Sequence, residues 1–131
     1  MSLSLRTPIL VVEDDLADGF FLTEQLRQAH LEDCVTLVRS GKEALEFLSS
    51  TAAPPRVIFL DLKLPGLCGI ELLRKIRHEP RLNTVPVIII SGSINPSDVT
   101  ECSELGVTAY LPKPVNLATF IAIVAPQSFS K

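Results

Sequence analysis

The chain has 131 residues, of which 47% are hydrophobic and 21% charged, which fits one globular domain with its own core and excludes a disordered chain. Fifteen acidic residues against twelve basic ones give a net charge of -3, which argues against a dedicated nucleic-acid-binding protein. Three widely spaced cysteines and the lack of any run of ~18 to 20 apolar residues predict a cytoplasmic protein with reduced thiols and no membrane span.

The first three predicted elements are a strand, a helix and a strand. Residues 9–12 are all apolar and are followed by acidic residues, which predicts a strand buried on both faces. Residues 16–30 follow a helical period, and residues 34–38 form a second strand. The predicted core face of the helix carries Phe21, Leu22, Leu26 and Ala29. Because successive residues of a helix are 100° apart, Phe20 is then expected to point outward.

The middle of the chain repeats this alternation of strand and helix. Ser40 is followed three residues later by Glu43, which is the spacing of a capping box at the start of a helix. Residues 57–60 form a third apolar run, which ends at Asp61. Residues 70–77 then predict another helix, so the pattern of a buried strand followed by a helix occurs again.

The last third of the chain contains two more strands, each followed by a predicted helix. Residues 87–90 form the fourth strand, and a helix opens at Asn95–Pro96 and closes at Gly106. Residues 107–111 form the fifth strand, and a final helix extends to about residue 124. Five strands alternating with five helices predict an α/β fold in which helices cover both faces of a parallel sheet.

We interpret the chain as a single domain with its core at residues 7–124 and tails at residues 1–6 and 125–131. In an open parallel sheet, ligands bind outside the carboxyl ends of the strands. Chemically active side chains therefore gather at that edge. They are Glu13, Asp14 and Asp15 after the first strand, Asp61 after the third, Ser91 after the fourth and Lys113 after the fifth.

This set of side chains suggests phosphoryl chemistry. Crowded carboxylates repel one another unless they are protonated or bridged by a cation, and hard oxygen ligands suit Mg²⁺. A metal ion and a lysine together can neutralise the oxygens of a phosphoryl group. A carboxylate beside the ion can be the nucleophile and form an acyl phosphate.

Four motifs in this order resemble the receiver domains of two-component response regulators, over roughly residues 7–124. They are Val12-Glu13-Asp14, Asp61-Leu62-Lys63-Leu64-Pro65-Gly66, Ser91-Gly92 and Tyr110-Leu111-Pro112-Lys113-Pro114. The resemblance implies a flavodoxin-like, doubly wound (βα)5 fold with strand order 2-1-3-4-5. It is closest in type to the single-domain regulators of chemotaxis, and residues 77–86 resemble a connection found in regulators paired with phytochromes.

The resemblance also implies a phosphoryl acceptor and a metal site. Asp61 is the expected phosphoacceptor. Glu13 and Asp14 are expected to bind Mg²⁺ or Mn²⁺ together with Asp61 and the backbone carbonyl of Lys63. The side chain of Lys63 either tunes the phosphoryl lifetime or is a solvated surface lysine. Asp15 is either part of the acidic site or only the cap of the following helix.

The remaining motif residues imply a conformational switch. Ser91 is the expected switch hydroxyl, where the family more often has Thr, and Lys113 is expected to pair with the phosphoryl group. Tyr110 is the aromatic residue whose rotation is expected to report phosphorylation. The Lys113–Pro114 peptide is where the family usually has a cis bond, which is accessible mainly before proline.

The function implied is a phosphoacceptor that takes its phosphoryl group from a histidine kinase or a histidine phosphotransfer protein. It would promote its own Mg²⁺-dependent phosphorylation without being a turnover enzyme. Its output would be a protein contact, either with a downstream target or as a homodimer through the fourth and fifth helices, and not nucleic acid or a membrane. The alternatives are a receiver fragment of a larger regulator or hybrid kinase, and a non-phosphorylated interaction module.

Other function classes fit the motifs less well. A phosphatase of the haloacid dehalogenase type needs a second acid two residues after its strand-end aspartate, and Lys63 occupies that position. A nucleotide- or flavin-binding module needs a glycine-rich phosphate loop, and none follows a predicted strand. Two features lie outside the motifs. The outward Phe20 is either an ordinary exposed aromatic or a docking residue, and the uncharged segment 115–130 is either a short frayed helix or an interface.

Overall fold

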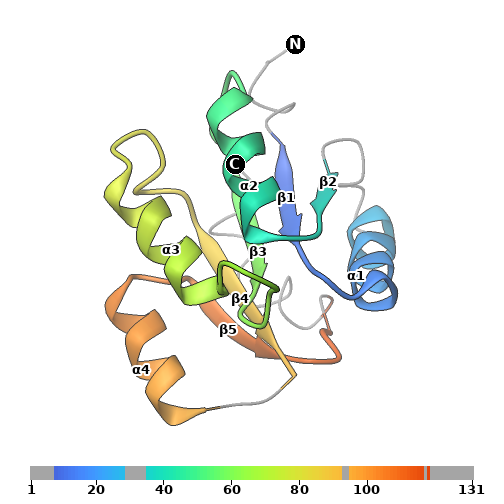
Figure 1. Cartoon of the computed structure of the whole chain (residues 1–131). Helices are drawn as coiled ribbons and strands as arrows, with labels where there is room; N and C mark the ends of the chain where they lie inside the picture. The colour runs from blue at the N-terminus through green and yellow to red at the C-terminus, as the bar shows by residue number, and fades with distance from the viewer. Residues whose placement is uncertain (1–7, 29–34, 93–94, 117, 119–131) are drawn as a thin grey trace.

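A five-stranded parallel sheet forms the centre of the computed structural model, which describes residues 8–28, 35–92, 95–116 and 118 (Figure 1). The strands are β1 (Ile9–Val12), β2 (Val35–Val38), β3 (Val57–Asp61), β4 (Val87–Ser91) and β5 (Ala109–Pro112). The helices are α1 (Leu16–Gln28), α2 (Gly41–Ser50), α3 (Gly69–His78) and α4 (Pro96–Glu104). The strand order β2-β1-β3-β4-β5 confirms the doubly wound fold class. The fifth predicted helix falls on residues outside those described.

The register of the strands brings their carboxyl ends to one edge of the sheet. Val12 at the end of β1 pairs with Leu60, and Ser91 at the end of β4 pairs with Pro112. All four strand pairs are parallel, so the residues that follow the strands leave the sheet on the same side. Asp61 is itself the last residue of β3 and lies at this edge.

Two hydrophobic cores lie on opposite faces of the sheet, because alternate strand residues point to opposite faces. Leu10 and its partners pack against α2, α3 and α4, whereas Ile9 and its partners pack against α1. Figure 1 shows α1 on one side of the sheet and the other three helices on the opposite side.

The predicted core face of α1 is correct for two residues and wrong for a third. Leu22 and Leu26 are buried, but Phe21 is 51% exposed, and Ala29 lies outside the described residues. The reason is Gly19, where an added Cβ would lie 3.1 Å from the side chain of Leu37. This close approach turns the narrow Gly19–Leu22–Leu26 stripe toward the sheet, and both phenylalanines then face outward.

The helix ends follow the predicted capping residues, with one change at β5. Ser40 Oγ accepts a hydrogen bond from the backbone N–H of Glu43 at 3.1 Å, as an N-cap does. Gly106 has φ +75° after α4, a left-handed conformation that favours glycine. β5 begins at residue 109 and not at 107, because the Val107 N–H still bonds the Cys102 carbonyl of α4 at 3.3 Å.

The guanidinium of Arg77 joins three segments that the sequence does not connect. From α3 it donates to the carbonyls of Val85 at 2.9 Å, Leu105 at 2.7 Å and Gly106 at 3.1 Å. Its burial lowers the pKa of this arginine, but the carbonyl oxygens compensate for the lost water. Arg77 thus ties α3 to the residues before β4 and after α4.

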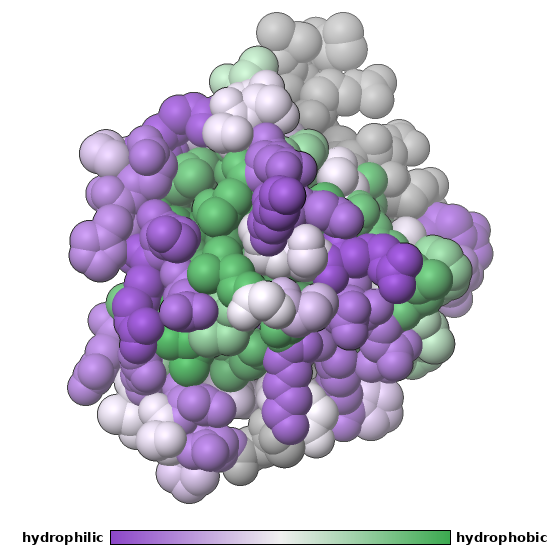
Figure 2. All heavy atoms as spheres, viewed as in Figure 1, coloured by the Kyte–Doolittle hydropathy of each residue, from purple (hydrophilic) through white to green (hydrophobic). Residues whose placement is uncertain are grey.

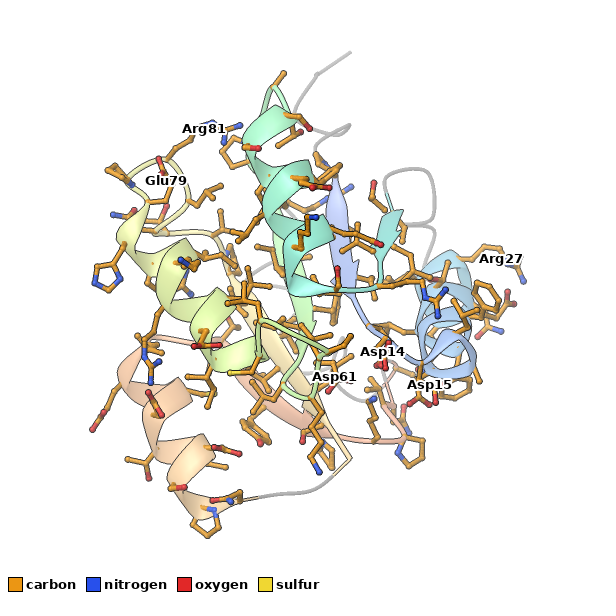
Figure 3. The ribbon with its side chains drawn as sticks, viewed as in Figure 1. Asp14, Asp15, Arg27, Asp61, Glu79 and Arg81 are labelled. Atoms are coloured by element: carbon orange, nitrogen blue, oxygen red, sulfur yellow. The ribbon has the colours of Figure 1, made fainter. Side chains whose placement is uncertain are left out.

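Hydrophobic atoms reach the surface over the space between α2 and α3 (Figure 2). A cavity of about 520 Å³ there is lined in part by Leu45, Leu48 and Ile76. Figure 3 shows Glu79 and Arg81, which also line the cavity, well away from Asp61. The cavity is therefore separate from the strand-end carboxylates. None of the helices in the described part of the chain is long and apolar enough to span a bilayer.

Candidate functional site

The end of β1 places one buried and two exposed acids at the sheet edge. Glu13 is 1% exposed, and its Oε2 accepts a hydrogen bond from the backbone N–H of Asp15 at 3.0 Å. Asp14 and Asp15 are exposed. Asp15 Oδ1 accepts from the backbone N–H of Asp18 at 3.0 Å, so Asp15 is the N-cap of α1.

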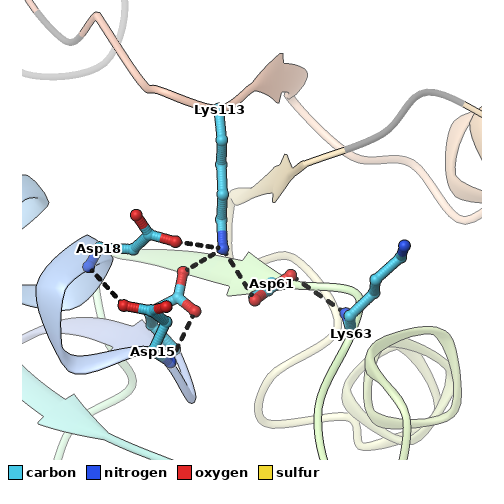
Figure 4. A network of polar contacts seen from close by, with 6 residues as sticks. Asp15, Asp18, Asp61, Lys63 and Lys113 are labelled. Atoms are coloured by element: carbon cyan, nitrogen blue, oxygen red, sulfur yellow. Dashed lines mark hydrogen bonds and ion pairs between the residues drawn. The ribbon is translucent and has the colours of Figure 1, made fainter.

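The end of β3 holds Asp61 in a confined position. Asp61 is 4% exposed, and its Oδ1 accepts a hydrogen bond from the backbone N–H of Lys63 at 3.0 Å. The side chain of Lys63 points away from the carboxylate (Figure 4). Gly69 begins α3 directly against this loop, because an added Cβ would lie 2.6 Å from the Asp61 carbonyl oxygen. A side chain at residue 69 would therefore displace the backbone that carries Asp61.

Lys113 connects three carboxylates from three different elements (Figure 4). Its Nζ lies 2.8 Å from Glu13 Oε1 after β1, and 3.1 Å from Asp61 Oδ2 at the end of β3. It also lies 3.0 Å from Asp18 Oδ2 in the first turn of α1. The predicted gathering of Glu13, Asp61 and Lys113 is thus present in the structure. Sequence reasoning missed Asp18, because an acid in the first turn of a helix is ordinarily explained by the helix dipole.

The charges at this edge do not balance. Burial, and after it the adjacent Asp61 carboxyl, raise the pKa of Glu13 to about 7, although Lys113 opposes the shift. Burial lowers the pKa of Lys113, but the three carboxylates outweigh burial and raise it above its ordinary value. The single positive charge of Lys113 lies among three carboxylates and cannot neutralise all of them. A further cation would therefore bind favourably here.

The raised pKa of the buried Glu13 predicts that stability falls as the pH rises. The pKa of Glu13 is 4.5 when the chain is unfolded and about 7 when it is folded, so the folded state holds a proton more tightly. Stability is therefore highest below pH 4.5 on this account and is lost as the pH rises through 7, by about 3 kcal/mol. We expect Glu13→Gln to raise the free energy of unfolding at pH 8 by about 1 to 3 kcal/mol and to change it little at pH 5.

Urea unfolding of both proteins between pH 5 and pH 8 measures this difference. Glu46→Gln is the matched control, because Glu46 is an exposed carboxylate on α2, away from the strand-end carboxylates. The control should show no pH-dependent difference from the wild type. A Glu13→Gln protein that is less stable than the wild type throughout this range would contradict the prediction.

The ends of β4 and β5 bring Ser91 and Tyr110 together. Ser91 is 2% exposed, and its carbonyl accepts a hydrogen bond from the backbone N–H of Lys113 at 2.7 Å. Tyr110 packs against the core that faces α2, α3 and α4, and its hydroxyl is buried. This burial raises the pKa of Tyr110, and the nearby Ser91 hydroxyl opposes the shift. The Lys113–Pro114 peptide is cis, as predicted.

The donor set fits a hard divalent cation by its chemistry. Glu13, Asp14 and Asp61 offer carboxylate oxygens, and the single ammonium of Lys113 lies among three carboxylates. As the side chains stand, no three His, Cys, Asp or Glu of the described residues are close enough to hold an ion. Suitable ligands are present at this edge, but they are not gathered around one point, because Glu13 and Asp61 are paired with Lys113.

The model of the response regulator receiver domain matches residues 9–125 of this sequence. The chain belongs to that family. Response regulator Rcp1 of Synechocystis sp. is 35% identical over 121 residues, which cover 88% of the receiver described here and 82% of Rcp1. Receiver domains of this family are phosphorylated on an aspartate in two-component signalling, and they act as signalling domains in contact with histidine kinases and downstream targets.

Solved structures of related receivers share the fold. The bacteriophytochrome response regulator RtBRR superposes with a TM-score of 0.80 at 39% identity, over 91% of this receiver and 76% of that chain. The phosphorylated cyanobacterial phytochrome response regulator RcpA gives 0.78 at 35% identity, over 92% and 90%. The Mn²⁺-bound form of Rcp1 gives 0.77 at 34% identity, over 95% and 94%. Receiver domains of this family bind divalent metal ions, as the Mn²⁺-bound form of Rcp1 does.

Proposed function

We propose that Asp61 accepts a phosphoryl group from the phosphohistidine of a histidine kinase or a histidine phosphotransfer protein in the cytoplasm. The observation that carries this proposal is the buried pair of Glu13 and Asp61 bonded to the single ammonium of Lys113 at the edge of the sheet. A carboxylate oxygen of Asp61 attacks phosphorus, the bond from phosphorus to the imidazole nitrogen breaks, and the imidazole leaves with the electron pair.

The residues around Asp61 have distinct proposed roles in this transfer. Glu13, Asp14, Asp61 and the backbone carbonyl of Lys63 would hold Mg²⁺ or Mn²⁺, which offsets carboxylate charge and orients phosphoryl oxygens. Lys113 Nζ lies 3.1 Å from Asp61 Oδ2, beside the proposed acceptor carboxylate. In the transfer, Lys113 would give up part of this contact and donate a hydrogen bond to a phosphoryl oxygen.

Ser91 and Tyr110 form the proposed switch. Ser91 ends β4 at the same edge as Asp61, and its hydroxyl would donate to a phosphoryl oxygen. Its displacement would change the packing around Tyr110, which lies on the core side of the sheet facing α4. We propose that the altered surface comprises α4, β5 and the fifth predicted helix, and that it binds a downstream protein or a second copy of the chain.

Acid-labile phosphorylation of the wild-type protein tests the proposal. We expect one phosphoryl group per chain after incubation with acetyl phosphate and Mg²⁺, mapped to Asp61 by peptide mass spectrometry. EDTA should prevent it. Two of the compared structures are named as phytochrome regulators, so a phytochrome-class histidine kinase is the first protein donor to test. An unmodified protein under all these conditions would favour the non-phosphorylated interaction module.

An exposed apolar patch on α1 is the proposed docking surface for the phosphodonor protein. Leu16, Phe20 and Phe21 are 40%, 61% and 51% exposed, and Phe21 lines a small hollow with Asp18 and Lys113. The patch therefore borders the acidic site. Because one buried aromatic side chain often dominates an interface, we expect Phe20→Ala to lower the rate of transfer from the donor protein about tenfold.

Transfer from acetyl phosphate should be unchanged in Phe20→Ala, because this small donor needs no docking surface. Glu24→Ala, toward the other end of α1, is the control for changes to the helix surface. Rapid-quench measurement of both donors separates docking from chemistry. Equal rates of protein-donor transfer for Phe20→Ala and the wild type would remove the patch from the proposal.

A further inference from the structure

The three carboxylates that bond Lys113 are not equivalent. An ammonium has three N–H donors, and Glu13, Asp18 and Asp61 each lie within 3.1 Å of Lys113 Nζ. The side chains of Glu13 and Asp61 are 1% and 6% exposed, whereas that of Asp18 is 44% exposed. In the proposed function, Glu13 and Asp61 also bind the metal ion, and Asp61 carries the phosphoryl group. Asp18 has no proposed contact with either the ion or the phosphoryl group.

Asp18 is held in place by the packing of α1. Its backbone N–H donates to Asp15 Oδ1 at 3.0 Å, which fixes the first turn of the helix. The next residue, Gly19, brings α1 against Leu37 of β2. Further along α1, Gln25 Nε2 donates to the Val115 carbonyl at 2.8 Å, two residues after Lys113. The helix and the segment after β5 are thus tied together at two points, one of which is the Asp18–Lys113 ion pair.

We propose that Asp18 is a positioning residue, which keeps the ammonium of Lys113 at the site when Glu13 and Asp61 engage the metal ion and the phosphoryl group. The inference rests on the proposed function. The four-carbon stem of a lysine has many rotamers, and an ammonium without a partner moves into solvent. With Asp18 as a fixed partner on α1, Lys113 stays within reach of the phosphoryl oxygens throughout the transfer.

The accessibility of the Lys113 amine tests this positioning directly. We propose to acylate the full chain briefly with a small N-hydroxysuccinimide ester and to quantify modified Lys113 by peptide mass spectrometry, with and without saturating Mg²⁺. In Asp18→Ala with Mg²⁺, we expect Lys113 to react about ten times faster than in the wild type. Without Mg²⁺ the two remaining carboxylates still hold the ammonium, and the increase should stay below about threefold.

Beryllofluoride binding gives a second readout, with this ion as a stand-in for the phosphoryl group. At saturating Mg²⁺, Asp18→Ala should bind beryllofluoride about ten times more weakly, because an unpositioned Lys113 must be ordered on binding. Asp18→Glu should recover most of the affinity, since it keeps the charge. Asp15→Asn is the matched control, because it removes a neighbouring charge, keeps a good N-cap and does not contact Lys113.

The outcomes separate the two proposals. Wild-type protein that binds no beryllofluoride with Mg²⁺ would overturn the proposed function itself. If the wild type binds and Asp18→Ala matches it in both Lys113 acylation and affinity, only the role of Asp18 is refuted. Tighter binding by Asp18→Ala would also refute it, because Asp18 would then compete with the phosphoryl group for Lys113. Thermal unfolding of each variant with Mg²⁺ checks that the proteins compared are folded.

Discussion

Asp61→Asn is expected to abolish phosphoryl uptake, to below about a hundredth of the wild-type level, because an amide oxygen is a poor nucleophile toward phosphorus. The fold should be retained. Asparagine has the same shape, its oxygen can still accept the Lys63 N–H bond that Asp61 Oδ1 accepts at 3.0 Å, and it removes one of two adjacent buried carboxylates. Intact-mass spectrometry after treatment with acetyl phosphate and Mg²⁺ measures the uptake.

The same Asp61→Asn protein also tests the effect of Asp61 on the pKa of Glu13, independently of phosphorylation. The Asp61 carboxyl raises the pKa of Glu13, so its loss should lower that pKa and reduce the fall in stability between pH 4.5 and pH 7. Asp15→Asn serves as the control, since it removes an exposed carboxylate that caps α1. Full phosphorylation of Asp61→Asn, with the phosphoryl group on another residue, would show that Asp61 is not the acceptor.

Lys113→Met is expected to have the largest effect on stability at this site. The side chain of methionine is similar in length but carries no charge, so Glu13 and Asp61 would lose the ammonium that lies 2.8 Å and 3.1 Å from them. Removing one partner of a buried ion pair costs about 3 to 5 kcal/mol. We expect a loss of this size at pH 8 in urea unfolding, and a smaller loss at pH 5, where Glu13 takes up a proton.

Two comparisons keep the Lys113→Met prediction testable even where the variant is barely folded. Lys63→Met removes an exposed lysine in the loop after Asp61 and should leave stability within about 0.5 kcal/mol of the wild type. Glu13→Gln combined with Lys113→Met should recover part of the lost stability, because one of the uncompensated charges is gone. A double variant no more stable than Lys113→Met would show that the destabilisation comes from lost packing and not from charge.

The main features of the fold and most of the site could be predicted from the sequence, because buried parallel strands end abruptly at polar residues. The apolar run at 57–60 ends at Asp61, and the run at 87–90 ends at Ser91, which places both side chains at one sheet edge. The topology then brings Glu13 and Lys113 to the same edge. Their distances and their shared ion pairs follow from packing and not from the pattern.

Three features could not be predicted, each for a physical reason. Asp18 contacts Lys113 across 95 residues of sequence, and only the position of α1 brings them together. Arg77 bonds backbone carbonyls, which leave no pattern of residue types. Helical periodicity predicts a broad apolar face that includes Phe21, whereas the close approach at Gly19 narrows the buried face and leaves Phe21 exposed.

The excess of carboxylates around Lys113 also bears on how long the protein lasts in a cell. Repulsion at the empty site lowers the free energy of unfolding, and ligands that bind only the folded state raise it. The empty receiver is therefore the form that opens more often and that proteases cleave more readily. We expect the cellular abundance of the protein to rise with the fraction of chains that carry the metal ion and the phosphoryl group. A cell poor in phosphodonor should then hold fewer receivers in total, as well as fewer phosphorylated ones.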